Sequence, residues 1–227
     1  MQVTVVLLIA GSGRRLGSDI PKQYIEVNGK ALLLHCLQHL SRCAQIKFVK
    51  PVIAQDDSYY HSCIAQHDFS FTLLNPVVGG SERVYSMQAG LNALSQQHEW
   101  VAIHDAARPL VEATMLNTLF KAAAQHGAAA PALHVIDTIK KIDANGFVLQ
   151  TPERQSLRAV QTPQVARKAW FEDAFSRLGV QLNQVTDDMS LLEACHYPVF
   201  LSEGHPNNRK ITMPEDLTWL KQTLDQS

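Results

Sequence analysis

Residues 3–17 read Val3-Thr-Val-Val-Leu-Leu-Ile-Ala-Gly-Ser-Gly-Arg-Arg-Leu-Gly17, a largely apolar run that leads into a glycine-rich turn. The segment 3–10 is rich in β-branched residues, which is typical of a central parallel strand covered on both faces. The turn carries two arginines, and Lys22 follows it closely. Glycines let backbone N–H groups approach an anion, and a helix that begins there adds its dipole. The stretch therefore predicts a buried strand that ends at an anion-binding turn.

Strands and helices alternate along the rest of the chain. We expect strands near residues 48–54, 71–74, 100–104, 130–135 and 197–202, and helices near 31–43, 58–66, 84–94, 112–125, 167–178, 187–195 and 214–224. This alternation predicts one α/β domain over residues 1–227, built on a doubly wound, largely parallel sheet. Ligands of such sheets bind beyond the carboxyl ends of the strands. The first glycine turn, a second at Gly79-Gly80, and Asp105 all follow expected strands, so we expect them to form one site.

A hairpin interrupts this alternation. Residues 138–142 and 147–150 read as two short strands, and Ala144-Asn145-Gly146 between them reads as a turn. A two-stranded hairpin is marginally stable alone. We therefore expect a protruding β-arm at about residues 137–160 that packs against another surface, with a second subunit as the candidate.

Composition narrows the possible partners and location. The 227 residues are 46% hydrophobic and carry a formal net charge of −1. This balance excludes a global attraction to nucleic acid or anionic lipid, so any anion site must be a local cluster of cations. The N-terminal apolar run is far too short to span a bilayer, and we expect no membrane partner. Four cysteines without a Cys-x-x-Cys pair are typical of free thiols in a cytoplasmic protein.

Common phosphate and metal motifs fit this sequence poorly. A Walker A motif is absent, and Gly17 comes one residue too late for the dinucleotide-binding fingerprint. His35, Cys36, His39 and Cys43 look like a metal-binding cluster, but Cys36 falls with leucines on the apolar face of an expected helix. We interpret this group as a buried thiol with solvated histidines.

Several segments together resemble one enzyme family, the cytidylyltransferases of the non-mevalonate isoprenoid pathway, which act on 2-C-methyl-D-erythritol 4-phosphate. The resemblance covers nearly the whole chain in order. It is carried by Ala10-Gly-Ser-Gly-Arg-Arg-Leu16, Pro21-Lys-Gln23, Gly79-Gly-Ser-Glu-Arg83, His104-Asp-Ala-Ala-Arg-Pro109, Asp137-Thr138, Thr162-Pro-Gln164, Thr186-Asp-Asp188, Ser190 and Lys210-Ile-Thr-Met-Pro-Glu-Asp216. The His-Asp-Ala-Ala-Arg-Pro run is the most specific of these pieces.

The resemblance implies a Rossmann-like nucleotidyltransferase that joins the acceptor phosphate to the α-phosphorus of CTP and releases pyrophosphate. It implies that Asp105 helps to hold Mg²⁺ and substrate, and that the β-arm crosses to the neighbouring subunit of a homodimer. The catalytic cations would be Arg15, Lys22 and Lys210. The nucleotide would be framed by Ala10, Gly11, Gly13, Gly80, Arg83, Ser86 and Ala107, and the acceptor side would include Thr138, Arg154, Thr162 and Thr186.

This reaction requires cations more than it requires a base. A phosphate monoester is largely dianionic at pH 7, because its second pKa is near 6. No side chain has to activate it. The difficulty lies in bringing two polyanions together and stabilising the leaving pyrophosphate, which positioning and electrostatics achieve.

Neighbours of these motifs have simpler interpretations. We interpret Arg108 as a structural ion-pair partner. Asp187 and Asp188 fit the first turn of a helix, where the helix dipole favours acidic side chains. The run Thr212-Met-Pro-Glu215 reads as a capping box that opens the last helix.

Two departures from the family pattern leave alternatives open. Leu8-Ile9 stands where the family usually has Pro-Ala, which narrows the expected base pocket. Asn207 stands where the family usually has Asp, so either the metal site loses a charge or that position serves packing. Three other functions remain as alternatives to the one that the resemblance implies: a cytidylyltransferase for another polyol phosphate such as ribitol 5-phosphate, a nicotinamide-dependent oxidoreductase, and a non-catalytic regulator.

Overall fold

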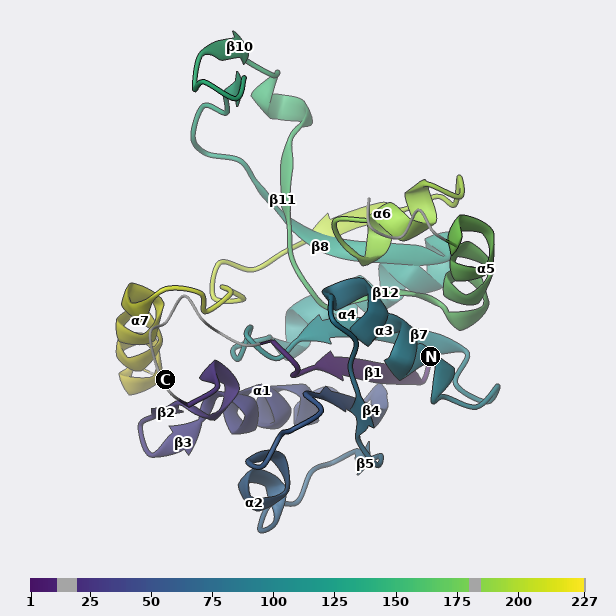
Figure 1. The fold of residues 1–227 in the computed structure, drawn as a ribbon, viewed down its shortest axis with the longest axis vertical. Coiled ribbons are helices and arrows are strands. Elements are labelled where there is room, and N and C mark those ends of the chain that lie inside the picture. The colour runs from purple at the N-terminus through teal and green to yellow at the C-terminus, as the bar shows by residue number, and fades with distance from the viewer. Residues whose placement is uncertain (12–19, 180–184, 227) are drawn as a thin grey trace.

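The fold is built around one mixed sheet (Figure 1). The structure, a computed structural model, describes residues 1–11, 20–179 and 185–226. Within these ranges the sheet has nine strands in the order β11-β8-β12-β7-β1-β4-β5, with β13 paired to β8 and β6 paired to β4. These strands are β1 (Val3–Leu8), β4 (Ile46–Ile53), β5 (Thr72–Leu73), β6 (Val77–Val78), β7 (Trp100–Asp105), β8 (Ala128–His134), β11 (Arg158–Val160), β12 (Gln164–Arg167) and β13 (Phe200–Glu203).

The helices fall where the sequence pattern places them. They are α1 (Leu32–Ser41), α2 (Tyr60–Ile64), α3 (Arg83–Asn92), α4 (Ala113–His126), α5 (Lys168–Leu178), α6 (Asp188–Glu193) and α7 (Pro214–Asp225). Short 3₁₀ turns cover Lys22–Tyr24 and Arg154–Ser156, and a small hairpin pairs β2 (Glu26–Val27) with β3 (Lys30–Ala31). The capping box of α7 uses Asp216 rather than Glu215, because the Asp216 carboxylate accepts the backbone N–H groups of Thr212 and Met213.

The parallel centre of the sheet sets the position of the site. β1 lies between β4 and β7 and runs parallel to both, so that Leu8 stands beside Val52 on one side and Asp105 on the other. All of β1 except Leu8 is buried, as expected for a strand covered on both faces. The three strands therefore end at one edge of the sheet, and Asp105 lies there.

Helices cover both faces of the sheet, which confirms the doubly wound architecture. Alternate residues of β1 point to opposite faces. Val5 and Leu7 belong to a core cluster that includes α1 and α4, whereas Val6 belongs to one that includes α3, α5 and α6. Gly127 ends α4 with a φ of +89°, and a side chain there would collide with the Trp170 ring.

Two antiparallel strands were not expected from the sequence. β12 inserts between β7 and β8 and runs antiparallel to both, and β11 pairs with the far end of β8. β12 has only four residues, with Val165 and Ala166 as its apolar pair, so it is too short to show a periodic pattern. Its insertion brings Thr162, two residues before β12, against the end of β7, where its hydroxyl contacts the Asp105 backbone N–H.

The β-arm leaves the body of the molecule (Figure 1). β9 (Lys141–Ile142) and β10 (Val148–Gln150) pair as an antiparallel hairpin, with Gly146 in its turn at a φ of +89°. Large apolar side chains remain uncovered along the arm, including Ile136 at 83% and Phe147 at 71% exposure. The pairing of β9 with β10 confirms the hairpin that the sequence predicts, and its apolar side chains are exposed in this chain.

His35 of α1 is buried rather than solvated, contrary to expectation, whereas His39 is partly exposed. His35 and His39 hydrogen-bond through a ring nitrogen to the carbonyl oxygens of Val27 and Val111, and Cys36 is fully buried. Burial lowers the pKa of His39 to about 4. In the described ranges no three His, Cys, Asp or Glu side chains gather as a metal cluster.

Over the same residues, no helix has both the length and the apolar character to cross a membrane.

Candidate active site

A cavity of about 550 Å³ opens at the carboxyl ends of β1 and β7. It lies at the sheet edge where a ligand is expected in this architecture. Nine predicted site residues line it: Ala10, Gly11, Lys22, Gly80, Arg83, Ser86, Asp105, Ala107 and Lys210. These residues come from five separate segments of the chain. Arg15 and Gly13, the other two predicted residues of the first turn, lie outside the described residues.

Gln23 holds the first wall of the cavity. Its side-chain amide nitrogen donates to the carbonyl oxygen of Gly11 at 2.9 Å and also to that of Ile9. Gln23 is buried, so these bonds fix the chain as it leaves β1. The neighbouring Lys22 donates from Nζ to the carbonyl oxygen of Ile211 at 3.2 Å, which brings the 3₁₀ turn close to the segment that carries Lys210.

The second glycine turn is tightly packed against the start of α3. A Cβ at Gly79 would lie 2.6 Å from Ser86 Oγ, and one at Gly80 would lie 2.3 Å from Tyr85 Cβ. The residue before α3, Glu82, makes no side-chain capping hydrogen bond. Glu82 and Arg83, at the start of this ten-residue helix, line the cavity, and a helix N-terminus favours an anion.

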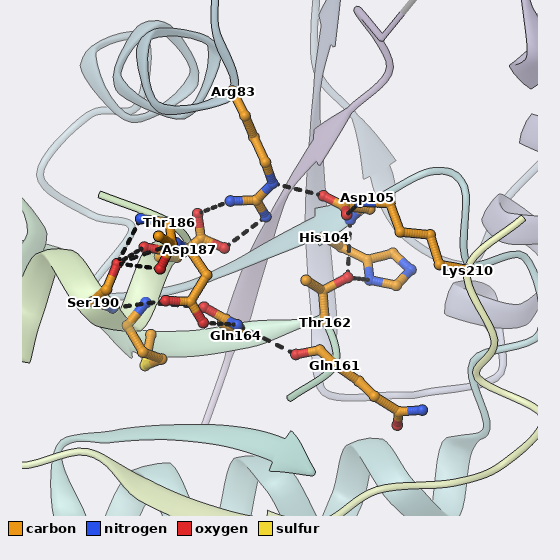
Figure 2. Close-up of polar contacts among 12 residues, drawn as sticks. Arg83, His104, Asp105, Gln161, Thr162, Gln164, Thr186, Asp187, Ser190 and Lys210 are labelled. Carbon is orange, nitrogen blue, oxygen red and sulfur yellow. Dashed lines mark hydrogen bonds and ion pairs between the residues drawn. The ribbon is translucent and has the colours of Figure 1, made fainter. Parts of the chain in front are cut away.

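Asp105 lies between two cations (Figure 2). Arg83 Nε donates to Asp105 Oδ1 at 3.0 Å, and Lys210 Nζ donates to Oδ2 at 2.6 Å. Burial alone would raise the pKa of Asp105, but Arg83 and then Lys210 outweigh burial and hold the pKa well below its usual range. The carboxylate is therefore ionised, and both of its oxygens already have partners.

Arg83 also bonds to a second carboxylate. Its Nη1 and Nη2 atoms donate to the two carboxylate oxygens of Asp188 at 2.6 and 2.8 Å. Asp188 is fully buried, and burial raises its pKa to about 6 even though Arg83 opposes that change. Asp187, not Asp188, caps α6, because it accepts the backbone N–H of Ser190 at 2.9 Å. The interpretation of Asp188 as a simple first-turn residue was thus incomplete.

Thr162 and His104 support Asp105 from behind (Figure 2). Thr162 Oγ1 accepts the Asp105 backbone N–H at 3.1 Å and contacts His104 Nδ1 at 3.0 Å. The other ring nitrogen of His104 lies 3.3 Å from the carbonyl oxygen of Arg108. Burial lowers the pKa of His104 to about 4, so the ring is neutral at pH 7. Thr162 is buried and, in the part of the chain that the structure describes, does not line the cavity.

The remaining predicted acceptor residues lie elsewhere in the chain. Thr186 is exposed, and its N–H donates to Ser190 Oγ at 3.0 Å. Thr138 and Arg154 are exposed on the β-arm, where Arg154 donates to the carbonyl oxygen of Ile136 at 2.6 Å. None of these three lines the cavity in the described part of the chain.

The Asn207 departure lies outside this cavity. Asn207 lines a separate cavity of about 370 Å³ together with His39 and Arg42. Its neighbour Asn208 is fully buried and donates to the Thr162 carbonyl oxygen at 2.8 Å. Arg108 donates to the Asn208 carbonyl oxygen at 2.7 Å, a backbone contact where an ion pair was expected. The segment before Lys210 is thus anchored by buried polar contacts.

This geometry defines a class of protein. A glycine turn, a helix N-terminus and several cations converge on one cavity at the carboxyl edge of a doubly wound sheet, which is the arrangement of a nucleotide- or phosphate-binding α/β protein.

Comparisons with known proteins narrow this class to one family. The profile of the 2-C-methyl-D-erythritol 4-phosphate cytidylyltransferase family (IspD) matches residues 3–226. The Symbiobacterium thermophilum protein of that name is 38% identical over 224 residues, which cover 99% of this chain and 93% of that protein. The Oryza sativa chloroplastic protein is 35% identical, over 99% of this chain and 75% of that protein. This chain belongs to the 2-C-methyl-D-erythritol 4-phosphate cytidylyltransferase family.

Solved structures agree with this assignment. The 4-diphosphocytidyl-2C-methyl-D-erythritol synthase of Anaerococcus prevotii superposes with a TM-score of 0.85 at 29% identity, covering 99% of this chain and 98% of that one. The 2-C-methyl-D-erythritol 4-phosphate cytidylyltransferase of Thermus thermophilus gives 0.79 at 28% identity, covering 99% and 100%.

Proposed function

We propose that the protein transfers the cytidylyl group of CTP to 2-C-methyl-D-erythritol 4-phosphate. The observation that carries this proposal is the convergence of Lys22, Arg83 and Lys210 with Asp105 and the α3 N-terminus in one cavity. These groups suit a polyphosphate, and the family membership supplies the nucleotide and the acceptor.

The reaction balances as one in-line displacement at phosphorus. An oxygen of the acceptor phosphate attacks the α-phosphorus, the bond from the α-phosphorus to the α,β-bridging oxygen breaks, and pyrophosphate leaves with that oxygen. Lys22 holds the triphosphate from the side of the first glycine turn, and Lys210 offsets charge at the α-phosphate or the incoming phosphate from the far side. We propose Arg15 as a third catalytic cation, acting with Lys22 and Lys210.

The nucleotide is held mostly by backbone groups. Ala10, Gly11, Gly13, Gly80, Ser86 and Ala107 frame it, and Arg83 supports the pocket from the start of α3. Ile9 is almost fully buried and Leu8 partly buried, and both residues line the cavity, so their bulk contributes to the shape of the pocket.

The carboxylate of Asp105 suits a Mg²⁺ ion that binds together with the nucleotide. Mg²⁺ in such sites binds one or two carboxylates plus substrate phosphates and retains waters. Asp105 supplies one ionised carboxylate at the cavity, and its two oxygens are engaged by Arg83 and Lys210. Asp105 would hold the ion, which when bound neutralises charge on the phosphates.

The acceptor site is completed by a second subunit in this proposal. Arg154 and Thr138 lie on the arm and away from the cavity of their own chain, and the arm exposes an apolar surface. A homodimer in which each arm crosses to the partner would bring Arg154 to the acceptor phosphate. Thr162 and Thr186 would complete the acceptor side. We propose further that residues 1–227 act as one domain and that the protein, whose four cysteines are unpaired, is cytoplasmic.

Pyrophosphate release tests the proposal directly. The protein with CTP and Mg²⁺ should release pyrophosphate with 2-C-methyl-D-erythritol 4-phosphate and far less with ribitol 5-phosphate. A preference for ribitol 5-phosphate would refute the acceptor, and tight NADH binding without CTP binding would refute the nucleotide. Binding of CTP with no turnover of either acceptor would identify a non-catalytic regulator.

A further inference from the structure

Arg83 connects two buried carboxylates that are far apart in sequence. Asp188, at the start of α6, accepts Nη1 and Nη2 of Arg83 at 2.6 and 2.8 Å. Asp105, at the end of β7, accepts Nε of the same guanidinium at 3.0 Å. Since a guanidinium is rigid and planar, fixing its Nη edge also fixes the direction of its Nε–H group.

The fold of α6 does not require a charge at position 188. Asp187 caps the helix, and Gln164 holds its first turn, because Gln164 Oε1 accepts the N–H of Met189 at 2.9 Å. The following residues of α6 pack in an apolar core cluster. Burying a carboxylate costs desolvation free energy, and apolar residues often replace a buried ion pair without loss of stability. The contact with Arg83 is therefore the feature that a carboxylate at this position serves.

We propose that Asp188 is a positioning residue for the reaction: it holds Arg83 so that Arg83 fixes Asp105 Oδ1 and leaves Oδ2 directed to the cavity. Lys210 Nζ occupies Oδ2 at 2.6 Å. Nucleotide phosphates compete for Lys210, and Oδ2 is then the carboxylate oxygen open to the Mg²⁺ that accompanies them. This inference rests on the proposed function, because it requires CTP in the cavity.

The charges of the network make the expected effect specific. Arg83 and Lys210 balance Asp105 and Asp188 in the apo site. Asp188→Asn keeps the size of the side chain but leaves one net positive charge and weakens the hold on Arg83. CTP binding without metal should therefore not weaken. The gain in CTP affinity from Mg²⁺ should fall about 10-fold, the low end of the effects seen when the groups that orient metal ligands are changed.

Calorimetry of CTP binding to the full-length protein, without acceptor, tests this. The measured quantity is the ratio of the CTP Kd in EDTA to the CTP Kd in Mg²⁺. Asp187→Asn is the matched control, because Asp187 lies on the same helix end and does not contact Arg83, and Asn also caps helices. We expect the ratio to fall about 10-fold in Asp188→Asn and to stay at the wild-type value in Asp187→Asn.

The outcomes separate the inference from the proposed function. Equal ratios in wild type and Asp188→Asn overturn the inference, and so does an equal fall in both Asp variants, which would mean that α6 packing matters and Arg83 does not. A wild-type protein that does not bind CTP overturns the proposed function instead. If Asp188→Asn does not fold, Arg83→Lys tests the fork through which Asp188 acts, because lysine keeps the charge but cannot bond to both carboxylates through a fixed fork. An unchanged ratio in Arg83→Lys overturns the inference.

A double-mutant cycle on kcat adds an independent readout. Asp188→Asn should lower kcat about 10-fold or more in the wild-type background and have no further effect in Arg83→Ala, because Asp188 acts through Arg83. A further loss of the same size in the Arg83→Ala background would overturn the inference.

Discussion

Acid should destabilise this protein through His104. The ring is fully buried, one nitrogen contacts the Thr162 hydroxyl, and the other lies against the carbonyl oxygen of Arg108. Thr162 Oγ1 already accepts the Asp105 N–H, so its own proton is available for His104 Nδ1. A neutral ring with its proton on Nε2 satisfies every partner. Protonation of Nδ1 would disrupt this arrangement behind Asp105.

The magnitude follows from the two pKa values. An unfolded histidine takes its proton near pH 6.5, whereas the pKa of buried His104 is lowered to about 4. The unfolded state therefore binds more protons between these values. The stability from His104 is fully present above about pH 6.5 and is lost as pH falls toward 4, roughly 3 kcal/mol in all. Between pH 7 and pH 5 the loss is about 2 kcal/mol.

Other groups titrate in the same range, so a variant must isolate this contribution. Asp188 acts in the opposite direction, because its pKa is raised to about 6 and it gains protons more readily when folded. The assay is urea unfolding at pH 7 and pH 5 for wild type and His104→Gln, with the exposed His67→Gln as control. The wild type should lose about 2 kcal/mol more than His104→Gln over this interval.

Equal losses in wild type and His104→Gln would refute the reasoning. If His104→Gln does not fold, a proton NMR titration of the wild-type ring decides. A ring that protonates near pH 6.5 in the folded protein would show that burial does not hold it neutral.

Three further predictions address the cavity, the arm and the core. Lys22→Ala should lower kcat at least about 100-fold without unfolding the protein, because it removes a cation from the phosphate site. The exposed Lys47→Ala is the control. Near wild-type turnover in Lys22→Ala would show that Lys22 does not have this role. Arg154→Ala should raise KM for the acceptor more than KM for CTP in steady-state assays, and equal effects would contradict its placement at the acceptor phosphate. Gly90→Ala should lower the free energy of unfolding, measured in urea, by about 1–2 kcal/mol. The new Cβ would lie 2.4 Å from Val6 Cγ1, and the cost of this overpacking exceeds the gain in helix propensity. An unchanged urea midpoint would show that the core relaxes around the added methyl group.

Sequence periodicity predicted most of the fold because its signals are local. The apolar run that became β1, the helical spacing of α1 and the glycine after α4 each report on neighbours within a few residues. The first cavity wall was predicted for the same reason, since its glycines directly follow a buried strand in the linear sequence. The β-arm was predicted from its turn residues, although its uncovered apolar surface is visible only in the structure.

The tertiary structure alone decided which distant side chains meet. Arg83 and Asp188 are 105 residues apart, and their pairing depends on the starts of α3 and α6 meeting across one face of the sheet. Thr162 reaches Asp105 because the short antiparallel β12 inserts beside β7, and four residues carry too little pattern to reveal that insertion. Hydrophobic patterning encodes which face of an element is buried, whereas the partners of a buried charge depend on how the finished layers pack. The sequence by itself thus determined the strands, helices and glycine turns, and packing determined the charge network that surrounds Asp105.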